Sequence, residues 1–402
     1  MHSEKSKSPL ITILLAIGLK TVGQVPAGIY LPSMVAMGIF FKVGHGYIQT
    51  ILGIYLLSYG ASQLVYGPIS DLYGRKLTSV VGLIIFFMGC FASIFSKSIY
   101  EMFFGSFLQG IGLGSVAVVS TAVLRDLFHD KRLLASSSYM GAATIVTPLI
   151  APIIGSYLQV GFGWRAPIAF SLFYGFFVFI LIILVFYETN VHAKIQALSI
   201  RKIVGGYISV LKSVNFVKYA ACRVLALSGG TAYAATAPFI FITLFRYSPV
   251  KYAWISIIPA IGFFIGSLLV KRLGKNRDEE TIVRIGALLL CLGSFLFLII
   301  WLIFGASPEV VVICMLIYML GSGIIFPSAL SGAILPLGVL AGTASGFIGS
   351  FQNLGRGAFS SLVGYFHNYT IYPLVITLCI LSLSCILIAF RLNKIMSSQK
   401  TP

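Results

Sequence analysis

The chain has 402 residues, of which 58% are hydrophobic and only 9% charged, and its formal net charge is +18. Soluble domains carry roughly 25% charged residues, so this composition excludes a soluble enzyme, a disordered chain and a disulfide scaffold. Positive charge indicates nucleic-acid binding when it gathers on one face of a soluble domain. Here short basic clusters separate long apolar runs, which indicates a polytopic membrane protein without a nucleic-acid partner.

Apolar runs long enough to cross a bilayer recur along the whole chain. A helix needs about 20 apolar residues to cross about 30 Å of hydrocarbon. Twelve runs qualify, and in chain order they are 9–35, 47–69, 77–96, 99–123, 135–159, 167–187, 219–245, 252–270, 282–304, 310–336, 342–366 and 371–390. The first run is too long for the apolar part of a signal peptide, so we expect it to remain as the first span.

The longest polar interruption, at 188–218, falls between the sixth and seventh runs. It predicts an N-terminal six-helix bundle over 1–187, a cytoplasmic linker over 188–218 and a C-terminal six-helix bundle over 219–402. Within the linker, apolar residues recur at helical spacing between basic ones, so we expect it to lie along the membrane interface. A plain connection between the two halves is the alternative.

The basic residues are divided unequally between the two sets of loops. With both termini on the cytoplasmic side, the cytoplasmic segments hold 20 Lys and Arg, and the outer loops hold 5. Such an excess marks the cytoplasmic side of a membrane protein. The sequence therefore predicts an all-α membrane protein of twelve transmembrane helices with cytoplasmic N and C termini. Three basic residues remain inside spans, and they are Lys20, Arg223 and Arg356.

Residue types that form metal or catalytic sites are missing from the span interiors. All six cysteines lie in apolar runs without a CxxC pair, which predicts neither a zinc site nor a disulfide framework. All ten acidic residues and all five histidines fall in loops or at span ends. An intramembrane enzyme needs a nucleophile beside a base, and an ATP-driven pump needs a Walker motif. We therefore expect no enzyme activity and no cofactor.

The loop between the second and third spans reads GPISDLYGRK, at 67–76. Gly67 and Gly74 permit a tight turn at the membrane edge. Asp71 and Arg75 stand four residues apart, close enough to interact directly or through nearby helix ends. The pattern closely resembles the signature of the major facilitator superfamily in the same loop.

Further motifs extend this resemblance over the whole chain. They are similar to the span-four motif, the loop after it, the span-five motif of the antiporters and two shorter motifs: FLQGIGLGS at 107–115, LRDLFHDKR at 124–132, PLIAPIIGSYL at 148–158, GWR at 163–165 and GIIFPSAL at 323–330. Together they resemble the drug-resistance transporters of the bicyclomycin/chloramphenicol (Bcr/CflA) type. The resemblance implies a major facilitator fold, with two six-helix bundles around a cavity that opens alternately to each side.

The resemblance also implies which residues take part in gating. They lie in the loops after the second and fourth spans and in span five: Gly67, Asp71, Gly74, Arg75, Arg125, Asp126, Pro148, Pro152 and Gly155. The prolines and the glycine of span five permit bends and close helix approach, which favours a hinge. An ordinary membrane helix rich in proline and glycine is the alternative.

Two positions depart from the proton-driven members of this branch. Those members usually carry an acid two residues before the Tyr of a YLP motif in span one, where this chain has Gly28. They also carry an Arg three residues before the Gln of the span-four motif, where this chain has Ser106. Loss of only one charge would leave the other unpaired in hydrocarbon, which is costly. The sequence therefore argues against proton antiport of the usual kind.

Two basic residues lie deep in spans instead. Lys20 and Arg356 are each about eleven residues from a span end, roughly 17 Å at 1.5 Å per residue. No acidic span residue can pair with them, so we expect them to face a watery cavity and to bind an anionic substrate. The alternative is that they bond to backbone carbonyls at helix bends. Arg223 is expected only about a turn from the cytoplasmic end of its span, where it can snorkel.

The candidate substrate-binding residues are the three span cations and the polar residues expected near them: Lys20, Gln24, Tyr55, Gln109, Arg223, Asn353 and Arg356. They favour a secondary transporter of a small organic molecule in the inner (cytoplasmic) membrane of a bacterium, acting as a monomer in the lipid bilayer. The charge census favours an anionic or neutral solute, such as a carboxylate metabolite or a carboxylate siderophore. Two alternatives stay open, namely a proton-coupled multidrug efflux antiporter of Bcr/CflA type and a membrane sensor that uses a transporter fold without transport.

Overall fold

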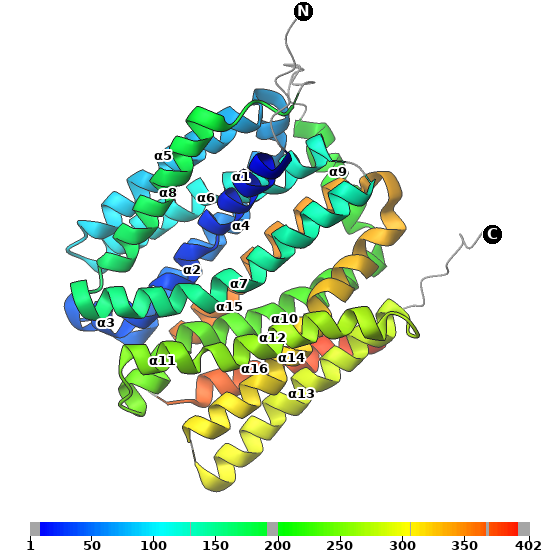
Figure 1. Cartoon of the computed structure of the whole chain (residues 1–402). Coiled ribbons are helices and arrows are strands. Elements are labelled where there is room, and N and C mark those ends of the chain that lie inside the picture. The colour runs from blue at the N-terminus through cyan, green and yellow to red at the C-terminus, as the bar shows by residue number, and fades with distance from the viewer. Residues whose placement is uncertain (1–8, 129, 191–199, 306, 367–369, 393–402) are drawn as a thin grey trace, which may run out of the picture. The chain divides into compact units, whose positions relative to one another are not determined.

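The computed structural model describes residues 9–128, 130–190, 200–305, 307–366 and 370–392, and within them the chain forms helices and no strand (Figure 1). The N-terminal residues 1–8, which include the basic residues Lys5 and Lys7, lie outside the described residues, as does the linker segment 191–199. The helices are α1 (Pro9–Val22), α2 (Val25–Ile29), η1 (Leu31–Ser33), α3 (Met34–Phe41), α4 (His45–Tyr73), α5 (Arg75–Ile94), α6 (Ile99–Leu127), α7 (Asp130–Phe162), α8 (Ala166–Val185), α9 (Ile200–Leu211), α10 (Val214–Pro238), η2 (Phe239–Leu244), α11 (Pro249–Ile255), α12 (Ile257–Leu273), α13 (Glu279–Phe304), α14 (Pro308–Ile334), η3 (Leu335–Leu340), α15 (Ala341–Tyr365) and α16 (Tyr372–Phe390).

The expected spans correspond to helices or to pairs of consecutive helices. Among the described residues, ten segments are long and apolar enough to cross a membrane, and a bent pair in the first span makes an eleventh. The remaining expected span, 342–366, is the eleventh in chain order and forms α15, which is less apolar because Gln352, Asn353 and Arg356 lie along it. The all-α membrane fold is confirmed, whereas the cytoplasmic placement of the termini stays a prediction.

The first span is interrupted near its middle. Its two parts, Ile11–Val22 and Val25–Phe41, meet at an angle of 42°. Pro26 stands at the start of α2 and has no N–H to donate to the carbonyl of Val22, four residues earlier, which is where α1 ends. The proline thus explains the position of the break. The apolar run 9–35 predicts one continuous helix there instead.

The chain divides into two structural units, each described by itself. The first unit comprises residues 1–41 and 54–198, and the second comprises residues 42–53 and 199–402. The boundary at residue 198 falls inside the expected linker. The short helix α9 belongs to the second unit, where the ring of Tyr207 lies 5.4 Å from that of Phe347 in α15. The expected position of the linker along the membrane interface stays a prediction.

Glycines set the closest helix contacts in both units, and they do so at matching positions. In the first unit, a Cβ on Gly112 of α6 would lie 2.5 Å from the carbonyl oxygen of Gly82 in α5. In the second unit, a Cβ on Gly321 of α14 would lie 2.5 Å from the carbonyl oxygen of Gly286 in α13. Because lipid gives no hydrophobic drive for helices to associate, such close backbone approach is a main source of their attraction. The α13–α14 pair therefore repeats the α5–α6 pair.

Replacement of Gly155 by alanine tests the contact between α7 and the first span. A Cβ at this position would overlap the carbonyl oxygen of Ile29, whereas a Cβ on Gly141 of the same helix meets no atom within 4 Å. Both substitutions raise helix propensity equally, so their difference isolates the overlap. We expect Gly155→Ala to be less stable than Gly141→Ala by about 1–3 kcal/mol, measured by thermal unfolding in detergent. Equal stability of the two variants would contradict the close contact.

Candidate functional site

Three of the candidate substrate-binding residues lie at the interruption of the first span. Gln24 precedes α2, and its buried Oε1 has no hydrogen-bond partner among the described residues. Tyr55 of α4 donates from its hydroxyl to the carbonyl of Gly23 at 3.2 Å. Lys20 lies one turn before Gln24 and is half-buried. Interrupted membrane helices are favourable ligand sites because their backbone groups are not all used within the helix.

The span-one position where the family resemblance implies an acid is Gly28, and it lies close to another helix. Gly28 is buried, and a Cβ there would lie 3.3 Å from the Cβ of Ala151 and 3.7 Å from Cδ of Pro152, both in α7. Two of the expected hinge residues of span five, Pro152 and Gly155, are thus the ones that contact the interrupted first span. A side chain at position 28 would therefore lie in tight contact with an apolar helix.

Gln109 lies between α5 and α6 and is only 4% exposed. Its Nε2 donates to the hydroxyl of Ser93 at 2.8 Å and to the carbonyl of Gly89 at 3.4 Å. These bonds use both N–H groups of the amide. The geometry gives Gln109 a role in holding the two helices together, and its contact with substrate stays a prediction.

Arg223 lies deeper in the second unit than the sequence indicates. Because α10 begins at Val214, Arg223 is roughly 14 Å into the helix. Its side chain is only 6% exposed, which argues against the expected snorkelling. Its Nε donates to Oε1 of Gln352 at 2.8 Å, and its Nη1 donates to the carbonyl of Phe326. The guanidinium also lies 3.9 Å from the centroid of the Phe326 ring. Arg223 thereby joins α10, α14 and α15.

Arg356 of α15 also reaches across to α10. Its Nε donates to the hydroxyl of Thr231 at 2.7 Å, and its Nη1 donates to Oδ1 of Asn353 at 3.4 Å. Asn353 in turn donates to the carbonyl of Gly349 at 3.1 Å. The groups that contact Arg223 and Arg356 in these bonds are neutral, and those around Arg223 do not compensate its positive charge. Three predicted substrate-binding residues, Arg223, Asn353 and Arg356, therefore lie in one polar cluster between α10 and α15.

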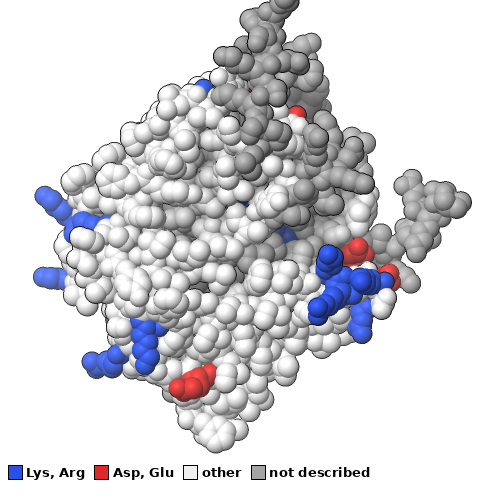
Figure 2. All heavy atoms as spheres, viewed as in Figure 1, with Lys and Arg blue, Asp and Glu red and all other residues white. Residues whose placement is uncertain are grey.

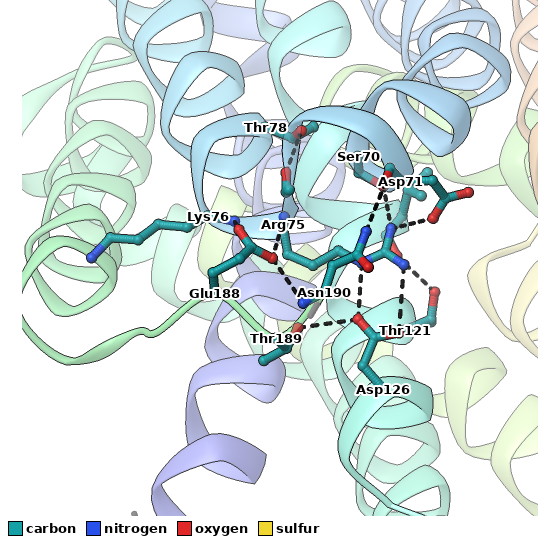
Figure 3. A network of polar contacts seen from close by, with 12 residues as sticks. Ser70, Asp71, Arg75, Lys76, Thr78, Thr121, Asp126, Glu188, Thr189 and Asn190 are labelled. Atoms are coloured by element: carbon teal, nitrogen blue, oxygen red, sulfur yellow. Dashed lines mark hydrogen bonds and ion pairs between the residues drawn. The ribbon is translucent and has the colours of Figure 1, made fainter. Parts of the chain in front are cut away.

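The gating motif forms a charged network at one end of the first unit (Figure 3). Arg75, at the start of α5, donates to Asp71 of α4 at 2.6 Å and to Asp126 of α6 at 2.9 Å. It also donates to the hydroxyl of Ser70 at 2.6 Å. The side chain of Arg75 is 9% exposed, so most of its charge is compensated inside the protein. One guanidinium thus holds three helix ends together.

Glu188 completes this network, although it is not among the residues predicted from the sequence. Its carboxylate accepts from the backbone N–H groups of Arg75 at 2.8 Å and of Lys76 at 3.0 Å (Figure 3). These are the first two residues of α5, where unpaired N–H groups and the helix dipole favour an anion. Gly74, which precedes α5, has φ of 92°, and a side chain there would collide with Glu188. The cap therefore comes from a residue more than a hundred positions away.

The segment after α8 attaches to the same helix ends through two further side chains. Thr189 donates to Asp126 at 3.1 Å, and Asn190 donates from Nδ2 to the carbonyl of Asp71 at 2.7 Å. Of the predicted gating residues, the structure brings together Asp71, Gly74, Arg75 and Asp126. Gly67 lies beside this network and accepts from Ser70 at 2.9 Å, whereas Arg125 and Pro148 are exposed. The arrangement holds the ends of α4, α5 and α6 and the segment after α8 in one position.

A helical chain with many apolar spans, an interrupted first span and arginines bonded to neutral groups inside spans has the features of a polytopic membrane transporter. The family model described as Major Facilitator Superfamily matches residues 19–360. The chain belongs to the Major Facilitator Superfamily, and the resemblance found in its motifs is confirmed. It is therefore a secondary transporter, with many spans, of the bacterial inner membrane.

Relatives and solved structures agree with this assignment. The chain is 30% identical over 353 residues to "Multidrug resistance protein D" of Escherichia coli K12, covering 87% of each chain. It is 24% identical over 376 residues to "Bicyclomycin resistance protein homolog" of Haemophilus influenzae, covering 93% of this chain and 94% of the relative. The crystal structure of a D-xylose-proton symporter matches with a TM-score of 0.75 at 16% identity, covering 96% and 97% of the two chains, and supports the fold alone.

Replacement of Arg75 tests the charged network. Arg75→Ala leaves Asp126 half-buried without its partner, and we expect a loss of about 2 kcal/mol in the free energy of unfolding, measured by thermal unfolding in detergent. Lys97→Ala removes an exposed basic side chain from another loop of the same unit, and should change stability by about 0.5 kcal/mol or less. Comparable losses for both variants would contradict the role of Arg75.

Proposed function

We propose that this chain exports small, drug-like organic molecules that are neutral or anionic. The names of the relatives support efflux of drugs, and they favour that alternative over a carboxylate metabolite or siderophore. The family supports alternating access between two halves. The charge preference is our own inference from the second unit.

The polar cluster between α10 and α15 supports the charge preference. Arg223 and Arg356 lie inside spans, and their hydrogen bonds go to an amide, a hydroxyl, a second amide and a backbone carbonyl. All described acidic residues lie in loops or in the first or last turn of a helix. A cationic drug would therefore meet the positive charge of Arg223, whose contacts are neutral, whereas an anion or a hydrogen-bond acceptor would be stabilised.

The two arginines have different roles in this proposal. Arg223 is 6% exposed and is held by hydrogen bonds and by the ring of Phe326, so it positions α15 against α10. Arg356 is half-buried, and its planar group suits an oxygen-rich substrate better than a lysine would. We therefore assign substrate contact to Arg356 and positioning to Arg223.

Substitution of Arg356 tests the proposal. We expect Arg356→Ala to reduce transport of an anionic fluorescent substrate at least tenfold in proteoliposomes, because the substrate loses its charge partner. Arg356→Lys should keep the charge but lose the paired geometry, and should raise KM more than it lowers kcat. Arg391→Ala, which removes an exposed arginine of the same unit, is the control. Unchanged transport by a folded Arg356→Ala protein would exclude substrate contact at Arg356. Absence of flux through the wild-type protein with every substrate tested would favour a sensor.

We further propose that energy coupling does not use a carboxylate in the first span. Gly28 occupies that position and is packed against α7, and proton relays in membranes normally use buried ionisable groups. In proteoliposomes, export of an anion should follow an imposed membrane potential, which is worth about 2.3 kcal/mol per charge per 100 mV. A pH gradient at zero potential should drive little export. Strong export driven by the pH gradient alone would refute this coupling.

A further inference from the structure

A basic patch lies where α12 of the second unit turns into α13. It consists of Lys271 and Arg272 in the last turn of α12 and of Lys275 and Arg277 in the following loop. All four side chains are exposed, and none forms a hydrogen bond or an ion pair with another described residue. Figure 2 shows Lys and Arg atoms gathered at this end of α12, with acidic atoms beside them. Four like charges within seven residues repel one another unless an anion lies between them.

The corresponding turn of the first unit has the opposite order of charges. There Asp71 precedes Arg75, and that arginine is compensated by two aspartates. In the second unit Lys275 precedes Glu279, at the same spacing before the repeated helix. Asp278, Glu279 and Glu280 stand at the start of α13, where acids complement the helix dipole without help from another segment. The four bases of this patch therefore hold no helix ends together, and their charges stay exposed.

An exposed apolar track on α12 leads directly to this patch. Ile261, Ile265 and Leu268 are 41%, 42% and 58% exposed. They follow one another at helical spacing, and the next positions on the same face are Lys271 and Arg272. A ligand that fits both parts must be apolar along about 10 Å of helix and anionic at one end.

We propose that this surface binds an anionic phospholipid, with an acyl chain along Ile261, Ile265 and Leu268 and the phosphate at Lys271 and Arg272. The position of these two bases in the last turn of a span puts them at the depth of lipid headgroups, which favours a lipid over a nucleic acid or an acidic peptide. Lys275 and Arg277 add to the attraction from the loop. Clusters of four or more basic residues beside a membrane helix attract anionic lipids in this way. The inference does not depend on the substrate proposed above.

Native mass spectrometry of the purified full-length protein tests the proposal. The protein in neutral detergent is titrated with phosphatidylglycerol and with phosphatidylcholine of identical acyl chains. We expect the wild type to prefer phosphatidylglycerol. The double variant Lys271→Gln/Arg272→Gln should lose about fivefold of that preference for each base removed, corresponding to about 1 kcal/mol each. The loop variant Lys275→Gln/Arg277→Gln should lose less.

The matched control removes one Arg and one Lys from the opposite end of the α11–α12 segment, in Arg246→Gln/Lys251→Gln. Both residues are exposed, so net charge changes equally, and we expect the preference to stay within twofold of wild type. An equal loss in Lys271→Gln/Arg272→Gln and in this control would show an effect of net charge alone and would overturn the proposal. A wild type without preference for phosphatidylglycerol would overturn it too. Glycerol phosphate at millimolar concentration should not displace the lipid, and its displacement of lipid would refute the role of the acyl track. Transport assays are not needed for any of these outcomes.

Discussion

The structure depends on close backbone approach between helices that have no hydrophobic reason to associate in lipid. Gly82 and Gly112 bring α5 against α6, and Gly286 and Gly321 bring α13 against α14. At such distances the carbonyl of one helix lies against the Cα of the next, so dispersion and weak polar contacts replace the hydrophobic effect. The same constraint applies at Gly28, where a side chain would lie in close contact with α7.

Charge is handled differently at the ends of helices and in their interiors. At the end of α5, Arg75 is surrounded by Asp71 and Asp126, and the helix terminus is capped by Glu188. In the interior of the second unit, Arg223 bonds to neutral groups, which hold its geometry but do not cancel its charge. An ion pair in the interior would be stable but silent toward a substrate. Neutral partners leave an electrostatic field that a ligand can use.

The predictability of each feature follows from the range of the interactions behind it. Apolar runs give the spans because length and hydropathy are local properties, and the pair Asp71–Arg75 is visible because its members are one helical turn apart. Glu188 was missed because its contact with α5 is a matter of tertiary structure. The depth of Arg223 was underestimated because α10 begins at Val214, within a stretch that looks polar. The break at Pro26 was overlooked because the surrounding residues remain apolar on both sides of it.

The two units use one backbone pattern with opposite charges, and this asymmetry separates their roles. In the first unit the acidic and basic residues at the turn before α5 are paired with one another, so that turn ties the helix ends together. In the second unit the turn before α13 keeps its acids at the helix start and presents its bases outward. Since helix N-termini favour acids in either unit, the difference lies in where the acid comes from. A distant Glu188 makes the first turn a junction between segments, whereas the local Glu279 and Glu280 free the second turn to interact with the membrane.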